Sequence, residues 1–259
     1  MTVSRTFSIR KSFLFFVFSL IYGVTLSQIP STEFKDYDNY VTYAESSLFI
    51  LANYLQQGFG PALFNEPIWL LINIALGLFA DPDKVVQLII FISAFLTAWL
   101  VLSNNPTHAF LLLPILFLPN LIKHHLIHLR QGLAIAVFLA GWYSVGNYKK
   151  WFWLILAPFI HSSFFVILCL YILNQLMQRL RSSVDIRFFS FLSIGLVTGL
   201  GLEWMASVLG ARQAYAYRFT PTGISGFGFA LWCVIFLVWI AEGRLFLRRY
   251  SFETSIILM

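Results

Sequence analysis

The sequence predicts an all-α membrane protein, a polytopic transmembrane helix bundle of about eight spans with an interfacial helix in its first outer loop. Of the 259 residues, 59% are hydrophobic and only 11% are charged, too few charges to cover a soluble domain of this length. The apolar residues also fall into runs near the roughly 20 residues that one helical crossing needs. We therefore predict one transmembrane domain over residues 1–259.

Apolar windows set the expected spans. The first is an uncleaved helix rather than a signal peptide, because Thr25 to Ser27 lack the small-x-small pattern of a cleavage site. Residues 44–64 are mildly amphipathic and predict the interfacial helix. Pro114, Pro119 and Pro158 fall inside spans, where broken helices are tolerated if they line a cavity. The spans are 12–29, 66–80, 85–102, 108–122, 131–147, 151–173, 188–209 and 225–243.

Loop charges then predict the orientation. With the N-terminus in the cytoplasm, 12 of the 17 Lys and Arg residues lie inside, 5 lie outside, and loop 30–65 is outside. This arrangement puts Arg130 on the opposite face from that loop. A re-entrant segment 108–129 would bring them together, but it would invert the later spans and leave 8 inside against 9 outside. The alternative is that 108–129 crosses and Arg130 lies deep in a wet cleft, and the sequence does not decide between the two.

The net charge, the cysteines and the histidines each have an explanation that needs neither a nucleic acid nor a metal ion. The net charge of +6 fits positive-inside topology and anionic lipid headgroups better than nucleic acid. Cys169 and Cys233 lie in apolar runs, as small buried hydrophobes do. His124 and His128 are spaced i, i+4 and could chelate a metal, but a cationic interfacial segment explains them as well. We expect no metal and no cofactor.

The first outer loop carries Asp36, Asp38 and Tyr40. Carboxylates accept hydroxyl protons and aromatic rings stack on sugar faces, so this loop suits a sugar ligand, although a plain solvated loop has the same composition. Glu66 precedes the second span and is either a boundary residue or a carboxylate in a cavity. The segment holding Tyr217 and Arg218 suits a sugar–phosphate ligand or an interfacial belt.

Two polar clusters interrupt the apolar helices. Arg130 and Gln131 stand where a long apolar helix starts, a position suited to phosphate or diphosphate, or to a snorkelling arginine. His161 and Ser162 lie about ten residues into their span. A histidine there handles protons, orients a substrate, or is simply buried and hydrogen-bonded.

Together these clusters resemble the EpsG-type family of exopolysaccharide biosynthesis proteins, similar in character to Wzy-type O-antigen and capsule polymerases. The resemblance covers roughly residues 30–175. It implies a multi-pass protein of the bacterial inner membrane that polymerises lipid-diphosphate-linked oligosaccharide repeat units at the outer face, beside bilayer lipids and other assembly proteins. Members of the family commonly run longer, so we expect a short or C-terminally truncated member. The matching segments are 36–40, 66–73, 130–134, 149–150 and 161–163.

The resemblance, with the GT-C-like membrane glycosyltransferases, implies a mechanism. Asp36 or Asp38 acts as general base, Arg130 neutralises the departing diphosphate, and His161 orients the substrate or returns a proton. There are two alternatives, a transporter or flippase of lipid-linked sugars and a non-catalytic scaffold. The transporter hypothesis predicts an inverted repeat, which we do not find in the sequence. The expected substrate-binding residues are Tyr40, Glu66, Gln131, Ser162, Tyr217 and Arg218.

Overall fold

The computed structural model describes residues 3–30, 34 and 36–208, together with the isolated positions 234, 237, 238, 241, 243 and 249. All regular structure in these residues is helical, which confirms the all-α class. The chain divides into two compact units, Met1–Phe164 and Phe165–Met259, which we describe separately. The first unit contains α1 (Val3–Ser27), α2 (Tyr37–Gln57), α3 (Phe59–Phe64), α4 (Pro67–Gly77), α5 (Pro82–Asn104), α6 (Ala109–Leu116), α7 (Pro119–Leu126), α8 (Leu129–Trp142), α9 (Asn147–Leu156) and η2 (Ala157–Phe159).

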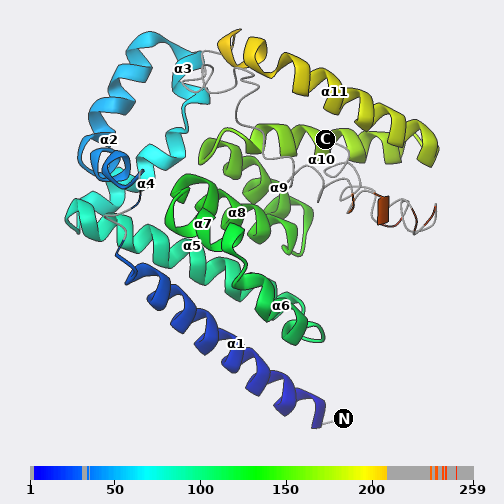
Figure 1. Ribbon diagram of the computed structural model, residues 1–259, viewed down its shortest axis with the longest axis horizontal. Coiled ribbons are helices and arrows are strands. Elements are labelled where there is room, and N and C mark those ends of the chain that lie inside the picture. The colour runs from blue at the N-terminus through cyan, green and yellow to red at the C-terminus, as the bar shows by residue number, and fades with distance from the viewer. Residues whose placement is uncertain are drawn as a thin grey trace. The chain divides into compact units, whose positions relative to one another are not determined.

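Helix α5 is the scaffold of the first unit. One face of it is fully buried, and α1 packs antiparallel along it (Figure 1). Phe16 contacts Trp99 edge to face, with ring centroids 5.6 Å apart, whereas Gly23, further along α1, lies against Phe91 near the other end of the contact. The C-terminal end of α1 therefore lies beside the N-terminal end of α5.

Helices α2, α3 and α4 lie between α1 and α5 in the chain and form a segment that we call the excursion. Both ends of the excursion lie at the start of α5. The chain reverses at Gly58, whose φ of 118° is a conformation that side chains other than glycine rarely adopt. The Tyr37 hydroxyl donates to the Asp83 carboxylate, so the two ends of the excursion meet. Helix α4 has 11 residues and is about 16 Å long, roughly half the thickness of the hydrocarbon core. Helix α4 is thus shorter than the segment 66–80 expected to cross, and this crossing stays a prediction.

The expected span over 108–122 is broken. Helices α6 and α7 meet at a bend of 60°, with Pro114 inside α6 and Pro119 at the start of α7. Proline cannot donate a backbone hydrogen bond, so the helical ladder is interrupted here. The carbonyl of Leu116 instead accepts a hydrogen bond of 2.7 Å from the buried Tyr22 hydroxyl of α1.

A second break follows α9. Pro158 lies in η2, and residues 161–163 form a turn. His161 was expected near the middle of a span over 151–173, but it lies between two helices, where its side chain can leave the helix axis.

The second unit contains most of α10 (Phe164–Arg179) and α11 (Val184–Val208). Among the described residues one helix, α5, is long and apolar enough to cross a membrane, and the α6–α7 pair is a second if it counts as one bent span. The expected number of about eight spans stays a prediction.

Candidate functional site

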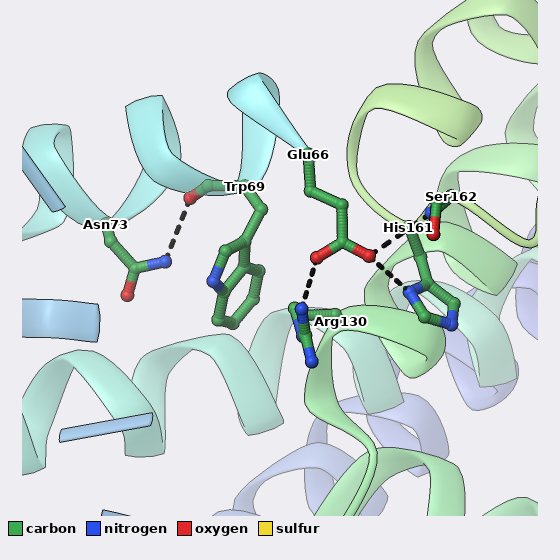
Figure 2. Close-up of polar contacts among 6 residues, drawn as sticks. All are labelled: Glu66, Trp69, Asn73, Arg130, His161 and Ser162. Carbon is green, nitrogen blue, oxygen red and sulfur yellow. Dashed lines mark hydrogen bonds and ion pairs between the residues drawn. The ribbon is translucent and has the colours of Figure 1, made fainter. Parts of the chain in front are cut away.

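The Glu66 side chain is the centre of a buried polar cluster (Figure 2). Arg130 Nη1 donates to one carboxylate oxygen. The other oxygen lies 2.7 Å from His161 Nδ1 and accepts the backbone N–H of Ser162 at 3.2 Å. Only 7% of the Glu66 side chain is exposed, against 20% for Arg130 and 14% for His161. A carboxylate that is almost completely shielded from solvent thus has three hydrogen-bond donors around it.

The three parts of the cluster come from three breaks in the helical structure. Glu66 caps the N-terminus of α4 in the left-handed conformation, with φ 60° and ψ 54°. Such a conformation costs about 1–3 kcal/mol for a residue other than glycine, and it persists when the surroundings hold it. Arg130 lies in the first turn of α8, and His161 and Ser162 lie in the turn before α10.

Charge and hydrogen bonding set the state of the cluster. An arginine and a backbone N–H both favour the ionised carboxylate. An ionised Glu66 requires a proton on His161 Nδ1, which leaves Nε2 as the nitrogen with a free lone pair in the neutral imidazole. A carboxylate that fixes the tautomer of a histidine is the arrangement by which hydrolases and transferases prepare a general base.

Aromatic side chains surround the guanidinium. The Cζ atom of Arg130 lies 5.4 Å from the centroid of the Tyr43 ring. Trp69 packs edge to face against Tyr40 and Tyr43, with centroids 5.8 and 6.2 Å apart. One turn along α4, the Asn73 amide donates to the Trp69 carbonyl at 2.9 Å. This wall fixes the position of Arg130 and adds a favourable cation–π contact.

A second pair lies beside the cluster. Asp36 Oδ2 is 3.8 Å from His128 Nδ1, and each side chain is 37% exposed. Burial and then the positive charge of Lys123 lower the pKa of His128, and Asp36 opposes them only in part. The imidazole is therefore neutral near pH 7, and this contact is polar rather than a full ion pair.

The structure brings together Arg130, His161, Glu66 and Ser162, all of them proposed from the sequence. Asp36 contacts His128, which lies beside these residues, whereas Asp38 is exposed on α2. Tyr40 is buried against Trp69, and Gln131 interacts with His124. Tyr217 and Arg218 lie outside the described residues.

Sequence reasoning missed the central place of Glu66 and the parts played by Tyr43, Trp69 and His128. One signal was available for Glu66, since a carboxylate directly before Pro67 and an apolar run is costly unless it is paired. Within the described residues, no group of three or more His, Cys, Asp or Glu side chains is placed to hold a metal ion. The donors around Glu66 are cationic or neutral, as an ionised carboxylate requires.

Large apolar side chains are exposed along several helices, for example Phe13, Leu14, Phe110 and Leu111. The charged side chain of Glu66, in contrast, is buried. Such exposed apolar surfaces are typical of a helical membrane protein. The chain belongs to the EpsG family, whose pattern matches residues 10–257, nearly the whole sequence. It is accordingly a membrane protein of exopolysaccharide biosynthesis. No curated protein and no solved structure matches it.

Proposed function

We propose that this protein polymerises lipid-diphosphate-linked oligosaccharide repeat units, and that the Glu66 cluster on the outer face of the membrane is its active site. The observation that carries the proposal is the convergence of Arg130 and His161 on the single buried carboxylate of Glu66. An arginine for a diphosphate and an oriented imidazole for a hydroxyl are what glycosyl transfer from such a donor needs.

A revised topology supports one common face. Tyr37 meets Asp83 at the start of α5, and Asp36 meets His128 just before α8. At the opposite end of α5, the Asn105 amide donates to the Tyr143 hydroxyl just after α8. Helix α8 thus runs parallel to α5, and the α6–α7 pair between them brings the chain back. If α2 to α4 stay on one side and the α6–α7 pair crosses, Asp36, Glu66, Arg130 and His161 share a face.

Loop charges agree with this topology. We count α9 with η2 and α10 as two separate crossings and continue the alternation through the expected spans 188–209 and 225–243. Eleven of the 17 Lys and Arg residues then lie on the N-terminal face and six on the other. The positive-inside rule then keeps the N-terminus in the cytoplasm and puts the cluster outside. The conflict between Arg130 and loop 30–65 came from counting 66–80 as a crossing. The six outer residues are Lys35, Lys84, Lys123, Arg130, Arg212 and Arg218.

The chemical step follows from the cluster. An acceptor sugar hydroxyl attacks the anomeric carbon of the donor and gives its proton to His161 Nε2. The bond between that carbon and the diphosphate oxygen breaks, and the electron pair leaves with the lipid diphosphate. Glu66 stabilises the imidazolium, and Arg130 offsets the growing negative charge. Histidine replaces Asp36 and Asp38 as the base, because its imidazole is oriented by Glu66 and Asp38 is exposed.

One observation favours the flippase alternative. The α6–α7 pair is a broken helix, as transporters use near their substrate sites. The two functions differ in what accumulates, because a defective polymerase leaves single lipid-linked units outside and a defective flippase leaves them inside.

The test is polysaccharide chain length in cells that lack the native gene and carry a variant. Arg130→Ala and Glu66→Gln should each leave single repeat units on the outer leaflet, and Arg130→Lys should restore part of the length. Lys84→Ala is the matched control, because the Lys84 side chain is 67% exposed and forms an ion pair with Asp81. Long chains from a correctly inserted Arg130→Ala protein would favour a scaffold, and units trapped inside would favour a flippase.

A further inference from the structure

Imidazoles gather beside the Glu66 cluster. The rings of His124 and His128, one turn apart at the end of α7 and the start of α8, have centroids 5.8 Å apart. His161 lies within electrostatic reach of both rings, and Arg130 within reach of His128. Histidines on three segments thus border the position where Arg130 would meet a ligand.

Arg130 by itself is a weak partner for a diphosphate. Its guanidinium is bound to the ionised carboxylate of Glu66, so the pair carries little net charge. A departing diphosphate gains negative charge in the transition state, and further positive charge must meet it there. Lys123 is exposed on α7, which leaves the nearby imidazoles as the half-buried source of charge.

We infer that His124 and His128 form, with Arg130, a subsite for the diphosphate of the donor, and that they take up protons when the diphosphate binds. This inference rests on the proposed function, since it names the group that holds the leaving diphosphate of that reaction.

The surroundings explain why these imidazoles change charge with the ligand. His124 faces Lys123, His128 and His161, with Gln131 as its hydrogen-bonding neighbour. His128 faces Lys123, His161 and Arg130, and only Asp36 among the groups acting on it is negative. Burial, and after it the positive charge of neighbours such as Lys123, disfavours a charged imidazole in the empty site. A bound dianion instead favours the protonated form of both imidazoles. Positive charge therefore arises only when the diphosphate is present, and the empty site does not hold several cations that repel one another.

Proton-linked binding is measured directly by calorimetry. The full-length protein, purified in an uncharged detergent, is titrated with inorganic pyrophosphate at pH 7 in two buffers that differ in ionisation enthalpy. The difference in heat gives the number of protons taken up. We expect uptake of about one to two protons and affinity that strengthens as the pH falls.

Substitutions assign the protons to residues. The pair His124→Gln and His128→Gln should abolish the uptake and weaken pyrophosphate binding about 100-fold, roughly tenfold for each lost charged hydrogen bond. His108→Gln is the control, because His108 is exposed at the start of α6. If the double variant does not melt cooperatively, His128→Gln alone serves, with a loss of about tenfold.

The outcomes separate this inference from the proposed function. Binding without proton uptake, or a double variant that binds within twofold of the wild type, would overturn the subsite. Phosphatidylglycerol micelles that displace pyrophosphate at equal phosphate concentration would reassign it to a lipid headgroup. Glu66→Gln should stop chain growth yet keep proton-linked binding, because it frees Arg130. A Glu66→Gln variant that still makes long chains and still binds in this way defeats the proposed function alone.

Discussion

Gly132 sits where α7 and α8 approach most closely, so its replacement by alanine tests the geometry of the site. A Cβ atom at this position would lie 2.9 Å from the His124 carbonyl carbon, closer still to the carbonyl oxygen, and 3.2 Å from His125 Nδ1. The first two are backbone atoms, which cannot swing aside as a flexible side chain does. The Gly132→Ala variant must therefore push the two helices apart.

The expected size follows from overpacking, which costs about 1–3 kcal/mol. At about 2–4 °C per kcal/mol for a chain of this length, the melting temperature should fall by about 2–12 °C. Arg130 lies two residues before Gly132, so a shift of about 1 Å there should also slow glycosyl transfer on the order of 100-fold. Both effects are measured on the same preparation, by thermal melting in detergent and by polysaccharide chain length in cells.

Gly77→Ala is the matched control. Its Cβ would lie 3.6 Å from the Ala44 carbonyl oxygen, an ordinary contact, so this substitution should leave the melting temperature and the chain length unchanged. If Gly132→Ala melts with the wild type and makes chains of full length, α7 and α8 are not in the close contact described, and the placement of Arg130 fails with it.

Two further predictions concern Asp36, just before α2, and the bent α6–α7 pair. Asp36→Asn should lower the pKa of His128 further, because it removes the one negative charge that raises it, whereas the exposed Asp38→Asn should not. Histidine titration followed by NMR measures both, and a midpoint that rises in Asp36→Asn would contradict the contact. Tyr22→Phe should cost about 1–3 kcal/mol, because it leaves the buried Leu116 carbonyl without its donor. Thermal melting beside Tyr148→Phe, a change at a 95% exposed ring, checks this, and equal melting temperatures would argue against the bond.

The sequence indicated the polar residues but not their grouping. Arg130 and His161 stood out because charged and titratable groups are costly beside apolar helices. Glu66 was placed among the ligand-binding residues, yet its partners lie 64 and 95 positions away. Contacts over such separations depend on how the intervening helices turn, and no local pattern encodes that.

The excursion α2 to α4 shows why the side of each loop is hard to predict from hydropathy. Residues 66–80 are apolar enough for a crossing, but α4 stops at Gly77 after 11 residues, and Tyr37 reaches Asp83 at the start of α5. The hydropathy of a segment shows that the segment can be buried. It does not show whether lipid or the packed interior of a helical unit surrounds it. In the proposed topology 66–80 does not cross and α9 and α10 cross separately, so only Lys84, Lys123, Arg130, Lys149 and Lys150 change sides.

The sequence by itself determined that this protein is helical, lies in a membrane and belongs to its family, because composition, apolar periodicity and ordered motifs are all local properties. Only the tertiary structure decided that Glu66 joins Arg130 to His161 and that His161 lies in a turn rather than within a helix. A buried carboxylate is stable only when its donors are placed around it, and that placement depends on the breaks at Gly58, Pro119 and Pro158, which set the directions of whole helices.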